Sequence, residues 1–228
     1  MSKNTHIFGA ELIGTAMVTA GPIAWGIWKS SGGEGTLLDA ATVSALPVLL
    51  GIFLFRTTSS QFNPAVTLWL LLTKRLSRGA ATAALAGQFA GAVGVALLLR
   101  LVANVPPAGM TVPHVSVPMA IMVELLLTLC LLAIIRKVAI ISPNDYGKDT
   151  QAVIISLGVV ALIVLGGPYT DASMNPVRSF GPAIAAGHGT SVHQVVYWAG
   201  PLFASVLLAV IERLVQPERP SSTINTPT

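Results

Sequence analysis

Charge is scarce in this sequence of 228 residues. Asp, Glu, Lys and Arg make up 10% of it, whereas a soluble domain carries roughly a quarter, so a soluble globular protein is excluded. The single cysteine, Cys130, excludes an internal disulfide, and its place in an apolar stretch predicts that it packs in the core. The sequence also lacks a phosphate-binding glycine loop, a recognisable nucleophile–base pair and metal-ligand spacing of histidines. We therefore expect no enzyme, metal or cofactor.

Apolar residues are abundant instead: they make up 53% of the chain, and the mean hydropathy is +0.75. A helix needs roughly 20 apolar residues to cross the hydrocarbon core. Six runs come near that length, at 7–28, 37–55, 80–102, 117–135, 152–165 and 192–215. The fifth is expected to stop before Gly166-Gly167-Pro168. The glycines expected at close helix crossings are Gly14, Gly87, Gly91 and Gly94.

Two landmarks occur twice at nearly the same offset. Asn63-Pro64-Ala65 and Asn175-Pro176-Val177 begin 112 positions apart, and Glu11 and Glu124 are 113 positions apart. The offsets predict an internal duplication, with repeat one at about 7–102 and repeat two at about 117–215. Each copy holds three spans, an odd number, so the two copies must be inverted in the membrane. Inverted repeats place a solute path at their interface.

Each Asn-Pro motif opens a stretch that is too short to span the bilayer, at 63–72 and 175–186. Proline is favoured in the first helical turn, where its missing N–H would have no partner anyway, and asparagine before it is a good N-cap. Non-helical backbone at membrane depth is tolerated only where protein buries it or where it lines a wet cavity. The sequence thus predicts an all-α membrane protein of six spans and two re-entrant half-helices around a pore or cavity.

Basic residues indicate the orientation. If both termini share one side, Lys29 and Arg100 lie in the loops of the other side, and Arg178 falls in the second re-entrant loop. The shared side carries Lys3, Arg56, Lys74, Arg75, Arg78, Arg136, Lys137, Lys148, Arg213 and Arg219. The positive-inside rule then places both termini in the cytoplasm. This bias accounts for the net charge of +4, so no nucleic-acid partner is implied.

Inverted symmetry predicts that the two half-helix N-termini meet near the membrane midplane. Each carries roughly half a positive charge, so the centre repels cations, while Asn63 and Asn175 offer amide donors to a neutral oxygen. A water held by both amides has its oxygen committed as an acceptor, which interrupts a proton wire. Glu11 and Glu124 could carry protons, but their matched positions favour a second role. We expect them to accept N–H groups of the re-entrant loops, which are costly to leave unpaired in lipid.

These residues resemble the aquaporin and glycerol-facilitator family, the major intrinsic proteins. The resemblance covers about 8–215 and rests on the two Asn-Pro motifs and on Arg178, three residues after the second asparagine. Further matching signatures are Glu-x-x-Gly-Thr from Glu11, Gly87-Gln88-Phe89-x-Gly91 and Tyr197-Trp198-Ala199-Gly200-Pro201. The resemblance implies a passive channel in a homotetramer with one pore per subunit. Its partners would be water, small neutral solutes and membrane lipids. We expect one channel domain at 1–215 in the cell membrane, followed by a disordered cytoplasmic tail at 216–228.

The resemblance also implies that Arg178 lies in an outer constriction with three other side chains. A count without gaps places them at Val43, Ile163 and Ala172. Many strict water channels have Phe and His at the first two positions. Here both residues are aliphatic, which widens the constriction and removes a polar wall. Ser179, Ala183 and the Tyr197-Trp198 pair resemble the water-channel branch instead.

Three positions depart from the pattern of the family. Gln61 stands where the family usually has His, and we expect it to support the loop by hydrogen bonding without titrating near neutral pH. Asp171 replaces a usual Gly; it either pairs with Arg178 or, as we favour, is a solvated loop carboxylate. Val177 replaces the usual Ala and adds bulk beside Asn175.

The predicted function is a passive channel for water, with a broader range of neutral solutes left open. The alternative is a glycerol, urea, metalloid or hydrogen peroxide facilitator with little water selectivity. A coupled secondary transporter can also use inverted repeats and broken helices, but neither motif supplies an ion-coupling carboxylate. A junction or adhesion protein would leave the polar re-entrant loops unexplained.

Overall fold

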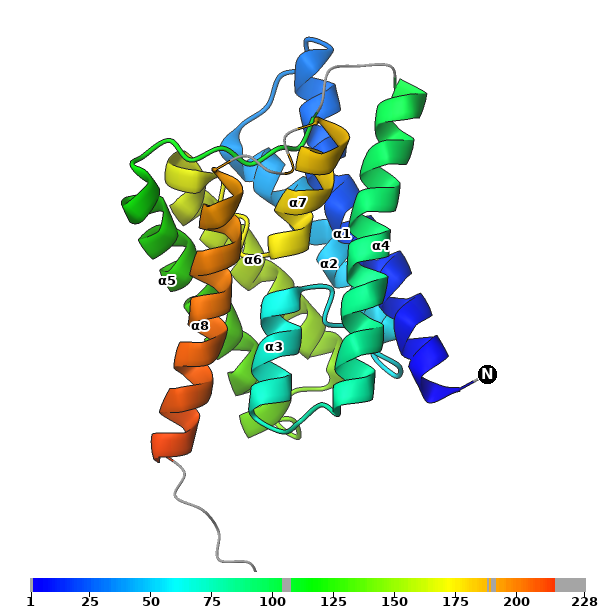
Figure 1. Ribbon diagram of the computed structural model, residues 1–228, viewed down its shortest axis with the longest axis vertical. Helices are drawn as coiled ribbons and strands as arrows, with labels where there is room; N and C mark the ends of the chain where they lie inside the picture. Colours follow the sequence, from blue (N-terminus) through cyan, green and yellow to red (C-terminus); the bar gives the residue numbers. More distant parts are fainter. Residues whose placement is uncertain (1, 104–107, 188, 190–191, 216–228) are drawn as a thin grey trace, which may run out of the picture.

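The computed structural model describes residues 2–103, 108–187, 189 and 192–215. Within these residues all of the regular secondary structure is helical (Figure 1). Six helices are long and apolar enough to cross a membrane. They are α1 (Lys3–Ser30), α2 (Leu37–Phe55), α4 (Arg78–Ala103), α5 (Val117–Ile135), α6 (Lys148–Thr170) and α8 (Gln194–Val215). Two short helices, α3 (Pro64–Leu72) and α7 (Pro176–Ala185), follow the Asn-Pro motifs. A π-helical turn, η1 (Arg136–Ile141), extends α5. The expected tail lies outside the described residues.

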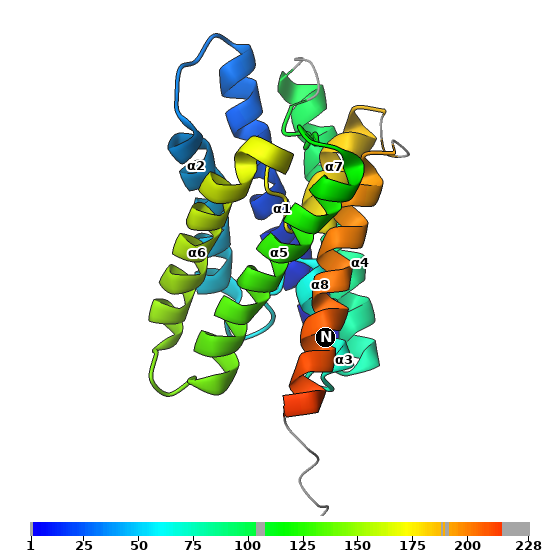
Figure 2. The same ribbon diagram turned by 90° about the vertical axis from the view of Figure 1, so that its left-hand side faces the viewer.

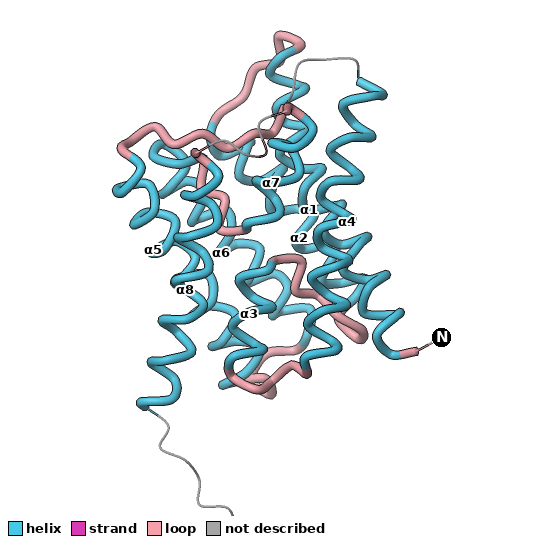
Figure 3. Tube along the Cα trace, in the orientation of Figure 1, coloured by secondary structure: helices cyan, strands magenta, loops and turns pink. Residues whose placement is uncertain are grey.

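The start of α1 and the end of α8 lie at the same end of the molecule, which we call the terminus side; the opposite end is the far side (Figure 1). Helix α1 packs against α4, α5 against α8, and α2 against α6 (Figure 2). Helix α3 enters from the terminus side and α7 from the far side. The loops before α3 and α7 run through the interior, between the spanning helices (Figure 3). The predicted fold, six spans with two inverted half-helices, is confirmed.

Two glycines set the distance between paired helices. A Cβ on Gly87 would lie 2.5 Å from the backbone oxygen of Phe8 in α1, and a Cβ on Gly200 would lie 2.9 Å from that of Ile121 in α5. Both distances are shorter than real Cβ contacts allow, so only glycine fits. Gly87 and Gly200 are 113 positions apart, the offset of Glu11 and Glu124, and they mark the repeat once more.

The other glycines expected at crossings differ among themselves. Gly91 packs on α1, because its Cβ would lie 2.2 Å from the oxygen of Leu12. Gly14 instead makes room for the ring of Phe62 in the first re-entrant loop, with Cβ distances from 2.0 Å. The prediction is wrong for Gly94, whose Cβ would meet nothing within 4 Å.

Two more expectations are wrong. Helix α6 does not stop before Gly166-Gly167-Pro168 but continues to Thr170. Its last carbonyls find partners outside the helix: the Tyr169 oxygen accepts the N–H of His114 at 2.8 Å, and the Thr170 oxygen accepts the hydroxyl of Tyr197 at 3.1 Å. Cys130 is exposed on α5 rather than packed in the core, so it faces the surroundings of the helical bundle.

Candidate solute pathway

The two half-helices begin in the same way. Pro64 and Pro176 occupy the first turn, and the preceding asparagines are the N-caps. The side-chain oxygen of Asn63 accepts the N–H of Ala65 at 2.9 Å, and that of Asn175 accepts the N–H of Arg178 at 3.4 Å. In each case the amide oxygen accepts a backbone N–H of the first helical turn, which has no partner within the helix. The NH₂ group of each asparagine therefore points away from its own helix.

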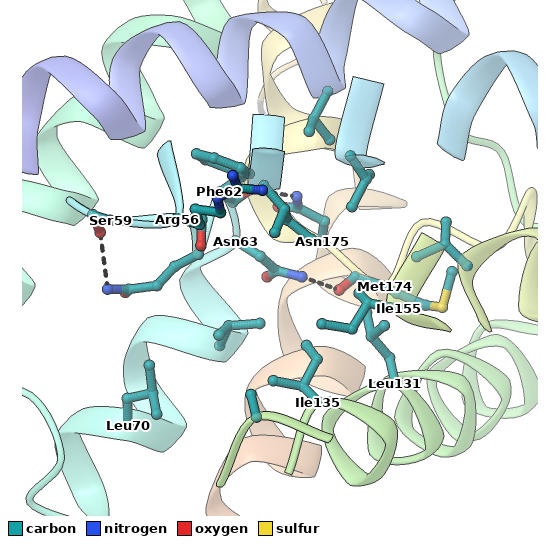
Figure 4. A pocket seen from close by; sticks show the side chains of 18 of the residues that line it. Arg56, Ser59, Phe62, Asn63, Leu70, Leu131, Ile135, Ile155, Met174 and Asn175 are labelled. Atoms are coloured by element: carbon teal, nitrogen blue, oxygen red, sulfur yellow. Dashed lines mark hydrogen bonds between the residues drawn. The ribbon is translucent and has the colours of Figure 1, made fainter. Parts of the chain in front are cut away.

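Each asparagine reaches across to the loop of the other repeat. The Nδ2 of Asn63 donates to the oxygen of Met174, and the Nδ2 of Asn175 donates to the oxygen of Phe62, both at 2.8 Å (Figure 4). An amide has two N–H donors, so each asparagine keeps one beyond this bond. The centre of the molecule is thus held together by a reciprocal pair of hydrogen bonds.

Two fully buried glutamates hold the loops that supply these carbonyls. Glu11 accepts the N–H of Gln61 at 2.8 Å and of Phe62 at 2.7 Å. Glu124 accepts the N–H of Ser173 at 2.8 Å and of Met174 at 2.7 Å.

Phe62 and Met174 have positive φ angles of 50° and 54°, a conformation that few non-glycine residues adopt. In it, each residue gives its N–H to a glutamate and its carbonyl to the asparagine of the other repeat. The surrounding bonds stabilise the strained backbone.

A side-chain network supports the first loop further. Gln88 of α4 is fully buried and donates to Glu11 at 2.8 Å and to Thr67 at 2.9 Å. Thr67 in turn donates to the oxygen of Gln61 at 2.6 Å. Gln61 therefore bonds within the loop region through its side chain. Thr67 was missed by the sequence interpretation because a threonine in an apolar half-helix gives no signal of its own.

A cavity of about 610 Å³ runs past both asparagines. It reaches Arg56 and Lys148 on the terminus side and Arg178 at its other end. Arg56, at the end of α2, forms an ion pair with Asp149 of α6. Leu131, Ile135 and Ile155 form an apolar wall beside the asparagines (Figure 4). The cavity thus combines a few fixed polar groups with an otherwise apolar lining.

Three of the four residues counted for the outer constriction line this cavity: Ile163, Ala172 and Arg178. Val43 is not among the lining residues, whereas the next residue, Ser44, is. Ser44, Val48 and Ile52 are four positions apart, so they share one face of α2. Val43 points about 100° away from that face, and its backbone oxygen lies where a Cβ on Gly21 of α1 would meet it at 2.6 Å.

Asp171 does not pair with Arg178 and is not simply a solvated carboxylate. Its Oδ2 accepts the N–H of Val112 at 2.8 Å, and its Oδ1 lies 3.1 Å from Nε2 of His114. The guanidinium of Arg178 donates instead to the backbone oxygen of Gly109 at 3.4 Å. Both the arginine and the aspartate therefore contact the connection between α4 and α5, a pair of contacts that was not predicted.

Known proteins are similar to this chain in sequence and in architecture. The family profile described as Major intrinsic protein matches residues 2–211. The chain is 33% identical over 219 residues to the probable aquaporin TIP3-2 of Oryza sativa subsp. japonica, covering 92% of this chain and 82% of the rice protein. It is 29% identical over 208 residues to aquaporin NIP6-1 of Arabidopsis thaliana, covering 87% of this chain and 65% of that protein.

A solved structure has the same fold. The aquaglyceroporin from Plasmodium falciparum superposes with a TM-score of 0.81 at 20% identity, covering 94% of this chain and 98% of that chain. The six spans make the protein a multi-pass integral membrane protein. Together with the match over 2–211, they show that the chain belongs to the major intrinsic protein family of membrane channels, which are not enzymes.

Proposed function

We propose that residues 1–215 form one passive channel for water and other small neutral solutes. The observation that carries this proposal is the pair of asparagines beside a continuous cavity, each tied to the loop of the other repeat. Because both side-chain oxygens bond to their own helices, the groups left for a solute are N–H donors. A passing oxygen accepts from them, while its carbon or hydrogen atoms slide along Leu131, Ile135 and Ile155.

Charge exclusion follows from the same residues. The N-termini of α3 and α7 both point at the centre, where each contributes roughly half a positive charge, and Arg178 adds a full charge at one end of the cavity. A cation entering the cavity would lose its hydration shell in a positive field. A water that accepts from both asparagines cannot accept a proton from its neighbour, so hydronium transfer is interrupted.

The outer constriction supports a solute range broader than water. We assign it to Ser44, Ile163, Ala172 and Arg178, which carry no aromatic ring to narrow the opening. Relatives and neighbours are named both as aquaporins and as an aquaglyceroporin, in keeping with either range. Facilitation of glycerol, urea, hydrogen peroxide or undissociated metalloid acids is part of this proposal.

The chain is further proposed to form a homotetramer, with one pore in each subunit, in the cell membrane with both termini in the cytoplasm. The basic residues near the terminus side support this orientation. A coupled transporter would need a carboxylate facing the cavity to bind the coupling ion, and the described residues that line the cavity include no Asp or Glu. The oxygens of the two buried glutamates instead accept hydrogen bonds from N–H groups of the re-entrant loops.

Stopped-flow light scattering on proteoliposomes tests the proposal. Vesicles with the protein should shrink faster than empty vesicles in an impermeant osmolyte, and should re-swell faster in glycerol or urea. An imposed proton gradient should not accumulate solute. Water flux at the level of empty vesicles would reject the channel; accumulation driven by protons would favour the transporter.

A further inference from the structure

A short segment at 109–114 lies on the far side and is tied to the loop between α6 and α7 and to α7 itself. We call it the outer-mouth segment. The carboxylate of Asp171 accepts the N–H of Val112 at 2.8 Å and contacts the His114 ring at 3.1 Å. The hydroxyls of Thr111 and Ser179 lie 2.8 Å apart. At one end of the segment, Gly109 accepts a hydrogen bond from Arg178.

Asp171 has a backbone conformation that normally belongs to glycine. It is the C-cap of α6, with φ of 58° and ψ of 9°, the left-handed region in which helices commonly end on Gly. A non-glycine residue there carries a conformational cost, and such outliers point to function when the side chain is used. Here the side chain makes two contacts, both to the outer-mouth segment.

The position of Gly109 leaves little room for movement toward α1. Its φ is 74°, and a Cβ would lie 2.7 Å from Cγ1 of Ile23 and 2.8 Å from the Ile23 backbone. With α1 on one side and the Asp171 contacts three and five residues further on, the carbonyl of Gly109 is held toward Arg178.

We propose that Asp171 is a positioning residue for solute selection: through the outer-mouth segment it restrains Arg178 and so limits the size of solute that enters the cavity. This inference rests on the proposed function, because it assigns a role in the same constriction. A solute larger than the resting opening passes only when Arg178 moves aside, so a looser restraint raises its flux. Water already passes the resting opening, so its flux increases little.

The test compares three variants in proteoliposomes, by water flux and by glycerol flux. Asp171→Gly removes both contacts and puts glycine in a conformation that glycine prefers, so the fold should tolerate it. Asp171→Asn keeps an oxygen for the Val112 N–H but removes the charge. Glu34→Gln is the matched control, since it removes an exposed carboxylate from the loop between α1 and α2, and none of the hydrogen bonds of the outer-mouth segment described above involves it.

We expect Asp171→Gly to raise the ratio of glycerol to water flux by about two- to tenfold, the factor that losing one hydrogen bond is worth. Asp171→Asn should restore most of the wild-type ratio, and Glu34→Gln should leave it unchanged. A ratio that stays constant in Asp171→Gly, or a parallel fall in both fluxes, would overturn the inference. If Asp171→Asn behaved like the glycine variant, the role would lie in charge and not in position, which also overturns it.

Hydrogen–deuterium exchange provides a readout that does not depend on permeation. The amides of Val112 and His114 should exchange faster in Asp171→Gly than in the wild type, and not in Glu34→Gln. Wild-type vesicles without water flux would refute the proposed function while leaving this measurement interpretable. Unchanged exchange would refute the restraint itself, whatever the channel conducts.

Discussion

Arg178 is the charged side chain of the proposed constriction, and its positive charge acts on any solute that enters. We expect Arg178→Val to preserve or raise the flux of neutral solutes and to weaken the exclusion of protons, because the fixed charge and its donors are both lost. A pH-sensitive dye inside proteoliposomes measures the proton leak. An unchanged leak together with an unchanged solute range would show that Arg178 lies outside the constriction.

Ser44 and Val43 are neighbours in the sequence but face different directions, so they form a matched pair. Ser44→Phe would place a ring in the cavity that Ile163 also lines. We expect glycerol flux to fall at least about tenfold, since a barrier increase of roughly 1.4 kcal/mol suffices, with a smaller loss for water. Val43→Phe should leave the ratio of the two fluxes near that of the wild type. The reverse order of effects would restore the gap-free count.

The side chains at the centre were easier to predict than those at the rim, where Ser44 and the contacts of Asp171 were missed. Asn63, Asn175, Glu11 and Glu124 stood out because each pair recurs at the repeat offset. Ser44, which we propose in place of Val43, is one residue away from the gap-free count, and a shift of one residue turns a helical side chain by about 100°. Asp171 contacts Val112 and His114, which are 59 and 57 positions away in the sequence. No local sequence pattern predicts contacts between residues so far apart.

At the scale of whole helices, close glycine crossings fix how α1 and α4 approach each other. Gly87→Ala should destabilise the protein by at least about 1–3 kcal/mol, the usual cost of overpacking, because even a methyl group meets the Phe8 backbone. Gly94→Ala is the control. A Cβ on Gly94 would meet nothing within 4 Å, and alanine is a better helix former than glycine, so this variant should be neutral or slightly more stable. Thermal unfolding in detergent measures both. Equal melting temperatures for the two variants would contradict the crossing.

Helix bounds were predicted well where periodic apolar sequence ends in polar residues, as at Leu37–Phe55 and Val117–Ile135. The prediction failed at the end of α6, where Gly166-Gly167-Pro168 signals a stop. Tertiary contacts outweighed that signal, because His114 and Tyr197 satisfy the carbonyls of the last turn. Cys130 shows the converse: an apolar context does not tell a residue in the protein core from one that faces lipid.

For the molecule as a whole, the duplication was the decisive prediction. The offsets of 112 and 113 positions implied the duplication. With three apolar runs in each copy, they also implied the inversion and the meeting of α3 with α7 before any contact was known. The structure adds that the two repeats use equivalent bonds, with equal distances from each glutamate to its loop. What differs between the repeats includes two charged residues of the second, because at the offset of 112 positions Val66 and Ser59 stand where Arg178 and Asp171 do.

Asn63 donates to Met174 and Asn175 donates to Phe62. Each half of the chain therefore needs the other half to complete the hydrogen bonds of its asparagine. A protein made of a single half would need a twin inserted upside down beside it, so it would have to enter the membrane in both directions. Such a half could not carry a strong bias of lysine and arginine toward one side. Joining two halves in one chain removes that conflict: each half is free to gather or shed basic residues as its own direction requires. The single orientation that we propose for this channel is thus made possible by the fusion of the two halves.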